Sequence, residues 1–236
     1  AVVDYLVHKS VWIIGGDGWA YDIGYGGLDH VFSTGRNVNI LVMDTEVYSN
    51  TGGQASKATS MGATAKFAMA GKSQSKKDLG MMAMAYGDVY VASVAFGARD
   101  AQSVRAIQDA ESYDGVSIVI GYSPCGEHGF ELIDGLDHQK LAVDTGYWQL
   151  YRYDPRRMGT GEPTLQLDSK PTKPLMDFLG QENRFNIIKR KDPARFEQLI
   201  TGADANLKRR RALYEKLAEL IVPGAANDGE AKEAAE

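Results

Sequence analysis

The sequence has 236 residues, of which 44% are hydrophobic and 24% are charged, an ordinary balance for one large globular domain with or without an extension. The net charge of −5 gives no reason to expect nucleic acid as a partner, and no apolar run approaches the roughly 18 residues of a membrane span. One cysteine excludes an internal disulfide framework and fits a reducing compartment. Because the N-terminus lacks a signal-peptide pattern, we expect a cytoplasmic protein.

Four short runs of apolar and β-branched residues are typical of buried parallel strands. These runs are residues 11–15, 38–43, 89–93 and 116–120. Three stretches between them carry helical patterns, at residues 23–32, 78–86 and 100–113. The alternation of strands and helices predicts an α/β fold with a doubly wound, mostly parallel sheet.

A long segment between the second and third strands has a different composition. Residues 49–77 are rich in Gly, Ala, Ser, Thr and Lys, which predicts a long loop. Loops of this length inside a compact domain are more often functional than idle. We therefore favour an active-site wall or a domain contact over a merely mobile loop.

The C-terminal part of the sequence predicts a helical extension. Residues 147–153 suggest an added strand, residues 155–174 are loop-rich, and residues 194–201 and 205–221 have helical patterns. The basic run from Lys208 to Arg211 predicts the solvated face of the last helix. We expect one domain at 1–153, an extension packed on it at 154–222, and a disordered tail at 223–236.

Small polar side chains follow the first two predicted strands. Gly16-Asp17-Gly18 comes after the first run, and Asp44-Thr45 comes after the second. Both clusters should lie at the carboxyl ends of neighbouring parallel strands, where open α/β sheets bind ligands. A carboxylate, a hydroxyl and free carbonyls suit a hard cation such as Mg²⁺ carrying a diphosphate. The alternative is that Asp17 only caps the helix that begins near Tyr21.

The strings GDGWAYDIGYGGLDH and MDTEVYSNTGGQASKAT closely resemble one family, the pyruvate:ferredoxin (flavodoxin) oxidoreductases. The resemblance runs from about Val11 to about Arg190 and is most specific over residues 11–72. Thr45-Glu46 stands where the general thiamin diphosphate motif ends in Asn. The resemblance implies the thiamin diphosphate-binding fold of the family's C-terminal domain. Because the family's chains are far longer, we expect a segment of a larger polypeptide or a processed subunit.

The resemblance also implies a set of site residues. In the family, the side chains matching Asp17 and Thr45 and the backbone carbonyl matching Val47 bind Mg²⁺. Thiamin diphosphate would lie against Gly16, Asp17, Gly18, Trp19, Thr45, Ser49, Asn50 and Thr51, with the glycines allowing close approach of the backbone. Asn50 is implied as the catalytic residue, donating a hydrogen bond as negative charge develops on oxygen. An Asx-turn at Ser49-Asn50-Thr51 is the structural alternative, and both roles can hold together.

Cys125 lies in a loop after the fourth predicted strand. A lone cysteine is usually a small buried hydrophobe. The resemblance instead implies that Cys125 is one thiolate ligand of a [4Fe–4S] cluster whose other cysteines lie outside this chain. The histidines do not form a metal-ligand spacing with Cys125. For His128 we favour a surface position over a role in supporting a ligand, and we expect Glu127 and Glu131 to be loop carboxylates.

The family's reaction is the oxidative decarboxylation of pyruvate with coenzyme A to acetyl-CoA and CO₂. Electrons pass through iron–sulfur clusters to ferredoxin or flavodoxin, and the family is homodimeric. In the family, the glutamate that activates the cofactor comes from another domain, so the resemblance implies that this segment is inactive alone. Two alternatives remain: a thiamin-dependent 2-oxoacid decarboxylase or synthase without iron–sulfur chemistry, and a non-catalytic α/β binding module.

Overall fold

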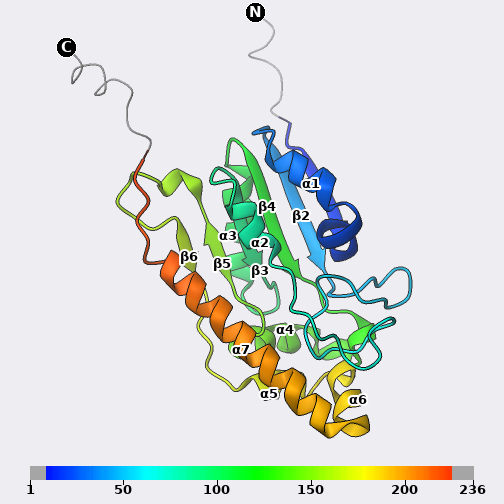
Figure 1. The fold of residues 1–236 in the computed structure, drawn as a ribbon. Helices are drawn as coiled ribbons and strands as arrows, with labels where there is room; N and C mark the ends of the chain where they lie inside the picture. The colour runs from blue at the N-terminus through cyan, green and yellow to red at the C-terminus, as the bar shows by residue number, and fades with distance from the viewer. Residues whose placement is uncertain (1–8, 225–236) are drawn as a thin grey trace, which may run out of the picture.

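The computed structural model describes residues 9–224, which are built around a six-stranded sheet (Figure 1). The strands are β1 (Trp12–Gly16), β2 (Val38–Asp44), β3 (Tyr90–Val94), β4 (Val116–Tyr122), β5 (Tyr151–Tyr153) and β6 (Leu165–Leu167). Their order is β1-β2-β4-β3-β5-β6. The first four strands are parallel to one another, whereas β5 pairs antiparallel with β3 and with β6. The four strands predicted before residue 121 are confirmed, with ends shifted by one or two residues.

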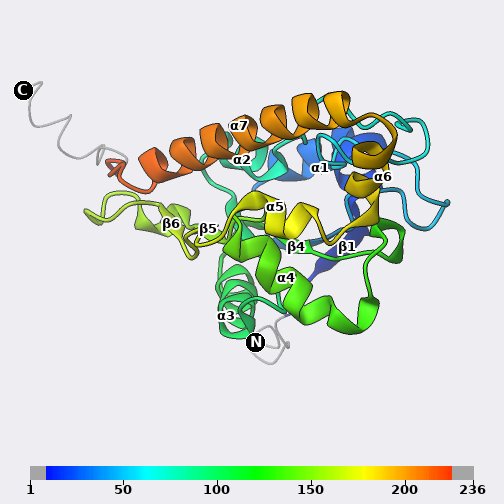
Figure 2. The ribbon, with the colours of Figure 1, turned by 90° about the horizontal axis from the view of Figure 1, so that it is seen from below.

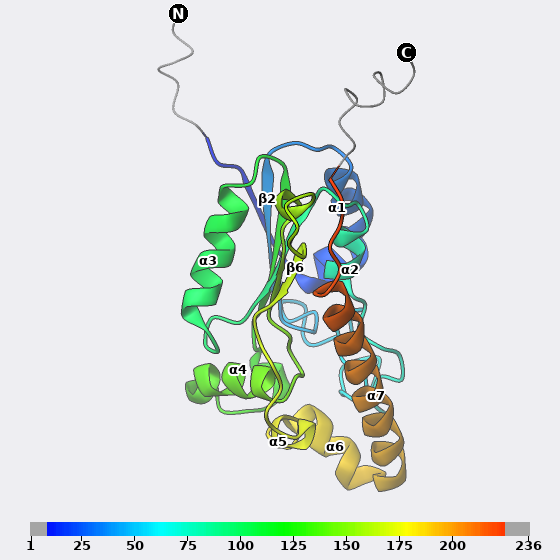
Figure 3. The same cartoon turned by 90° about the vertical axis from the view of Figure 1, so that its left-hand side faces the viewer.

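Helices cover both faces of the sheet (Figure 3). The connections to β2 and β3 run through η2 (Gly18–Ile23), α1 (Tyr25–Phe32) and α2 (Leu79–Met84), with α1 and α2 on one face. The chain then returns to β4 through α3 (Asp100–Glu111) on the opposite face. Reversing the direction of travel moves a right-handed crossover to the other face. The predicted doubly wound α/β fold is therefore confirmed.

The strand ends meet at one edge of the sheet. Gly16, the last residue of β1, lies opposite Met43, and Asp44, the last residue of β2, lies opposite Tyr122 of β4. The loops that follow these three strands therefore start side by side. In Figure 1 they gather below the strands, together with α4 (Gly135–Asp144), α5 (Leu175–Leu179) and α6 (Asn183–Lys191).

A 25-residue helix, α7 (Pro193–Leu217), packs on the same side of the sheet as α2 (Figure 2). The sequence predicts two helices here, separated near Gly202, and this prediction is wrong. Gly202 lies inside the helix, and a Cβ there would lie only 3.0 Å from Met61 Sδ, so the glycine allows close packing. Helices α4, α5 and α6 and the strand β6 were not predicted, since each is short or has a weak apolar pattern.

The prediction that the basic run is fully solvated is wrong for its second half. Lys208 and Arg209 are exposed. Arg211, however, donates a hydrogen bond of 2.7 Å to the Ser169 carbonyl, and Arg210 lies 3.9 Å from Asp78. No helix within residues 9–224 is long and apolar enough to cross a membrane. The domain boundary at 153/154 stays a prediction, and most of the predicted tail lies outside the described residues.

Residues 49–77 form the long loop that the composition predicts, and this loop has internal order. Isolated bridges join Tyr48 to Gln54 and Gln54 to Lys66. The Lys72 ammonium donates hydrogen bonds to the carbonyls of Ser56 (2.9 Å) and Thr59 (2.6 Å). The loop is therefore tied to itself from one end to the other.

Asp78 connects helix α7 to helix α2. Its carboxylate caps α2 by accepting from Met81 N (3.1 Å) and also accepts from Tyr214 Oη of α7 (2.8 Å). We expect Asp78→Ala to lower the free energy of unfolding by at least about 1–2 kcal/mol, the usual loss of a cap. The control Asp204→Ala removes only an exposed pair with Lys208 and should cost at most about 0.5 kcal/mol. Urea unfolding followed by circular dichroism measures both, and equal losses would contradict the prediction.

Candidate functional site

Asp17 follows β1 at the edge where the strands end, and its carboxylate is buried. Thr45 Oγ1 donates to Oδ1 and Ser56 Oγ donates to Oδ2, each at 2.7 Å. Asp17 occupies the N-cap position of η2 but accepts no hydrogen bond from the described helix backbone. The capping alternative is therefore wrong. Burial raises the pKa of Asp17, as does the nearby Asp44, and a bound cation would oppose both effects.

The Thr45 hydroxyl is the centre of a small oxygen cluster. Besides Asp17 Oδ1, it lies 2.9 Å from the Val47 carbonyl and 2.8 Å from Ser49 Oγ. A hydroxyl has a single proton, so it cannot donate to all of these oxygens at once. The spare lone pairs make the cluster a suitable ligand set for a hard cation.

The ligand set predicted for Mg²⁺ is thus brought together: the Asp17 carboxylate, the Thr45 hydroxyl and the Val47 carbonyl. Within residues 9–224, no group of three or more His, Cys, Asp or Glu side chains is placed to hold a metal. A site with one carboxylate and neutral oxygens fits Mg²⁺, which keeps phosphate oxygens or waters as its remaining ligands. The residues present therefore fit a Mg²⁺-diphosphate, although their roles remain predictions.

The glycines around Asp17 have two different surroundings. A Cβ on Gly18 would collide with the Tyr48 ring, and a Cβ on Gly15 or Gly24 would collide with the Trp19 ring. These three glycines therefore make room for aromatic side chains. Gly16 is exposed, and a Cβ there would meet only the Met43 carbonyl at 4.0 Å. Gly16 is thus the glycine that leaves the strand end open to a ligand.

Asn50 and Thr51 lie exposed at the tip of a tight turn. Its base is closed by hydrogen bonds of 2.9 Å from Tyr48 N to the Gln54 carbonyl and from Gly53 N to the Tyr48 carbonyl. Thr51 Oγ1 donates to Gln54 Oε1 at 2.7 Å. None of the hydrogen bonds found in residues 9–224 involves the Asn50 side chain, so the predicted Asx-turn is not formed. Its amide is free to face a ligand.

The loop that carries Cys125 packs against the same cluster. Cys125 is half-buried and is followed by the short helix η3 (Gly126–His128). Ser123 N donates to the Asp44 carbonyl at 2.9 Å, and His128 Nε2 lies 2.8 Å from the Thr45 carbonyl. Cys125 is therefore tied at both sides to the segment that holds the oxygen cluster.

The expectation that His128 lies on the surface is wrong, since its side chain is buried. Its other ring nitrogen, Nδ1, lies 3.3 Å from Glu182 Oε1, and Glu182 also pairs with His138 Nε2 at 2.9 Å. Glu182 is 54 residues from His128 along the chain, so the spacing of residues in the sequence does not reveal this contact. Glu127 and Glu131 are exposed, as expected.

A buried network of charges beside the site has no counterpart in the sequence analysis. Lys76 bridges Asp44 (2.7 Å) and Glu46 (2.9 Å), and Arg184 bridges Glu46 and Glu182, each at 2.7 Å. Burial opposes ionisation of Glu46, but Lys76 and Arg184 hold its pKa well below its usual range. Arg184 and the two histidines likewise lower the pKa of Glu182 to about 2, against the effect of burial. The sequence offered one signal of this network: two acids, Asp44 and Glu46, at the end of a buried strand.

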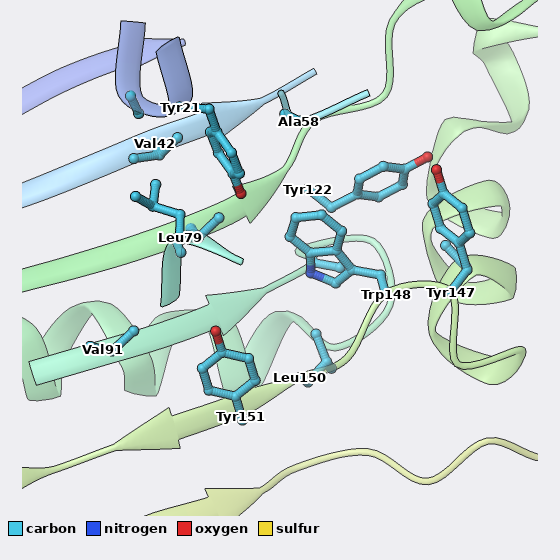
Figure 4. Close-up of a cluster of buried hydrophobic side chains, with 14 of the residues drawn as sticks. Tyr21, Val42, Ala58, Leu79, Val91, Tyr122, Tyr147, Trp148, Leu150 and Tyr151 are labelled. Carbon is cyan, nitrogen blue, oxygen red and sulfur yellow. The ribbon is translucent and has the colours of Figure 1, made fainter. Parts of the chain in front are cut away.

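Aromatic side chains contact this network: the Lys76 ammonium lies 5.0 Å from the centre of the Trp148 ring, and Tyr147 Oη donates to Glu46 Oε2. Tyr122 and Trp148 have ring centroids 5.0 Å apart, and Tyr147 packs on Phe178 at 4.3 Å. Figure 4 shows the hydroxyl groups of Tyr122 and Tyr147 on the same side, beyond the ends of the strands. The acids and Arg184 are buried, and attraction between opposite charges is stronger away from water.

Comparisons with known proteins identify the family of this chain. The profile described as "Thiamine pyrophosphate enzyme, C-terminal TPP binding domain" matches residues 3–120, half of the chain. The chain belongs to the thiamine pyrophosphate (TPP) enzyme family. TPP is another name for thiamin diphosphate, so the predicted cofactor is that of the family.

Individual relatives of this TPP enzyme segment are larger proteins. It is 58% identical to the pyruvate-flavodoxin oxidoreductase of Rhodospirillum rubrum, over 100% of this chain and 19% of that protein. It is 56% identical to the pyruvate:ferredoxin oxidoreductase of Moorella thermoacetica (92% and 18%) and 49% identical to the mitochondrial pyruvate dehydrogenase [NADP(+)] of Euglena gracilis (92% and 12%). The chain spans about a fifth or less of their length. The predicted resemblance is confirmed.

Among solved structures, the chain is similar to a 2-oxoglutarate:ferredoxin oxidoreductase from Magnetococcus marinus with 2-oxoglutarate, coenzyme A and succinyl-CoA bound. The identity is 26%, and the match covers 75% of this chain and 61% of that chain with a TM-score of 0.48.

The oxygen cluster generates a prediction about metal dependence. In the full-length protein, Thr45→Val keeps the shape of the side chain but removes the hydroxyl that joins Asp17, Val47 and Ser49. We expect it to raise the Mg²⁺ concentration for half-maximal TPP binding by about tenfold or more. Thr34→Val removes an exposed hydroxyl that donates to the Val31 carbonyl and accepts from Arg36 N, and it serves as the matched control. Calorimetric titration measures both variants, and an unchanged Mg²⁺ requirement in Thr45→Val would contradict the ligand assignment.

Proposed function

We propose that this chain is the thiamin diphosphate-binding part of a pyruvate:ferredoxin (flavodoxin) oxidoreductase, which converts pyruvate and coenzyme A to acetyl-CoA and CO₂. The observation that carries the proposal is the meeting of Asp17 Oδ1, Thr45 Oγ1 and the Val47 carbonyl at one edge of the sheet. High identity to oxidoreductases named for pyruvate supports the choice of substrate.

The residues of this chain would bind and orient the cofactor. Asp17, Thr45 and Val47 would hold Mg²⁺, which neutralises the diphosphate. Asn50, free at the tip of its turn, would donate a hydrogen bond to the oxygen of the 2-oxoacid as negative charge develops there. Bound thiamin diphosphate would supply the carbon nucleophile and the electron sink for loss of CO₂.

Cys125 would provide one thiolate to a [4Fe–4S] cluster. Clusters of this type need several thiolates, and this chain has one cysteine. The remaining ligands would come from the rest of the parent protein. The ties from this loop to Asp44 and Thr45 support the proposal, because they bring the cysteine loop against the metal-binding segment.

The parent protein would be a cytoplasmic homodimer that delivers electrons to ferredoxin or flavodoxin. The relatives' names give flavodoxin, ferredoxin and NADP⁺, yet this chain is 49–58% identical to all three. We infer that the electron acceptor is selected outside this segment.

The test uses the full-length protein purified without oxygen. Pyruvate should reduce methyl viologen only with coenzyme A, thiamin diphosphate and Mg²⁺ present, and Asp17→Asn should lower this rate by at least about 100-fold. Asp88→Asn, an exposed aspartate before β3 and outside the site, should leave the rate unchanged. If pyruvate loses CO₂ while viologen stays oxidised, a non-redox decarboxylase replaces the proposal.

Cys125 can be tested separately from the cofactor site. We expect Cys125→Ala to lower the iron content and the viologen reduction rate of the full-length protein, because the cluster loses one thiolate. Binding of thiamin diphosphate with Mg²⁺ should be unchanged, since no oxygen of that site is removed. Ser123→Ala, in the same loop, is the control. Full iron content and full activity in Cys125→Ala would contradict the ligand role.

A further inference from the structure

Glu46 stands between two of the proposed metal ligands, Thr45 and Val47, and has an unusual backbone conformation. Its φ is +58°, in the left-handed region that residues with a side chain rarely adopt. Such a conformation persists only where the surroundings hold it, and it is most frequent at functional sites. The reversal of chain direction at Glu46 accompanies the approach of Thr45 Oγ1 to the Val47 carbonyl at 2.9 Å.

The Glu46 side chain is held by four groups. Arg184 Nη2 donates at 2.7 Å and Tyr147 Oη at 2.5 Å to Oε2. Lys76 Nζ donates at 2.9 Å and Ser60 Oγ at 3.2 Å to Oε1. The Glu46 side chain is 1% exposed, so these partners replace its hydration entirely.

The Glu46 backbone is held as well. Its N–H donates to Asp44 Oδ1 at 3.0 Å, and its carbonyl accepts from Thr59 Oγ1 at 2.6 Å. Both peptide groups that flank the left-handed residue are therefore fixed. The side chain and the backbone of Glu46 together prevent relaxation to an extended conformation.

A second route reaches the same segment from the other side. The Thr45 carbonyl contacts His128 Nε2 at 2.8 Å, and the opposite nitrogen of that ring lies 3.3 Å from Glu182. Glu182 accepts from Arg184 Nε at 2.7 Å. The contacts thus close a ring from Thr45 through His128, Glu182 and Arg184 back to Glu46. Glu182 and Arg184, at the start of α6, are thus connected to both sides of the metal-binding segment.

We propose that Glu46, Arg184, Glu182 and Tyr147 are positioning residues for the Mg²⁺-diphosphate site, which they act on through Thr45 and Val47. The proposal rests on the proposed function. Mg²⁺ demands near-ideal octahedral ligand positions, so small displacements of two ligands strongly lower the affinity for Mg²⁺.

Burying the charged groups of this network costs desolvation free energy, which indicates a role besides stability. Buried ion pairs are frequently no more stabilising than apolar side chains of the same volume, because desolvation offsets their attraction. Arg184 Nη1 is buried without a hydrogen-bond partner among the described residues. A network that leaves a buried donor unpaired, yet holds a left-handed glutamate beside the ligand oxygens, suits a positional role.

The test measures metal dependence in the full-length protein stripped of metal with a chelator. Arg184→Met removes the ion pairs with Glu46 and Glu182. Tyr147→Phe removes a hydroxyl that bonds to Glu46, Ser60 and Arg184, with little change in volume. We expect Arg184→Met to raise the Mg²⁺ concentration for half-maximal thiamin diphosphate binding by about 10- to 100-fold, as for other residues that orient metal ligands. Tyr147→Phe should give a smaller shift in the same direction.

Two comparisons separate positioning from general destabilisation. Arg152→Met breaks half-buried pairs with Asp168 (2.8 Å) and Asp109 (3.1 Å) at the β5–β6 side of the sheet and should leave the Mg²⁺ requirement unchanged. Ca²⁺ accepts irregular geometry, so its half-saturating concentration in Arg184→Met should rise less than that of Mg²⁺.

The proposal is overturned if neither variant changes the Mg²⁺ requirement, or if Arg152→Met shifts it as much as Arg184→Met does. It is also overturned if Arg184→Met raises the half-saturating concentrations of Ca²⁺ and Mg²⁺ by the same factor. Failure of the proposed function looks different: Asp17→Asn would then leave the Mg²⁺ requirement intact in the same titration.

Discussion

Parallel, in-register pairing of β1, β2 and β4 is the constraint on which the site depends. Because Gly16 lies opposite Met43 and Asp44 opposite Tyr122, the loops after all three strands start at one edge. An aspartate after β1, a hydroxyl after β2 and a cysteine after β4 are thereby brought into one region. The chemistry of the site therefore comes from strand order, with residues far apart in sequence acting together.

Buried charge is the second organising feature. Asp44, Glu46 and Glu182 are all buried, and each is matched by a cation, Lys76 or Arg184. Lys76 comes from the long loop and Arg184 from α6, so both segments must be in place for the acids to stay ionised once they are buried. This requirement couples the formation of the metal-binding segment to the packing of the C-terminal helices.

The local signals in the sequence carried much of this account. The apolar runs predicted the four parallel strands, and the polar residues after two of them predicted that Asp17 and Thr45 lie close together. Val47 was added by the resemblance to the family. The pattern failed where long-range contacts decide. Gly202 suggests a break between two helices, but it lies within one helix and packs closely against Met61. His128 is buried and contacts Glu182, a partner that no spacing rule identifies. Arg184 and Glu46 were missed for the same reason, since they are 138 residues apart.

The central claim is that three oxygens of this chain bind the metal of a diphosphate cofactor. A crystal structure of the full-length protein with thiamin diphosphate and Mg²⁺ tests it most directly. The account predicts Asp17 Oδ1, Thr45 Oγ1 and the Val47 carbonyl at about 2.1 Å from the metal, with Glu46 still at positive φ. A metal bound elsewhere, or bound without Thr45 and Val47, would contradict it.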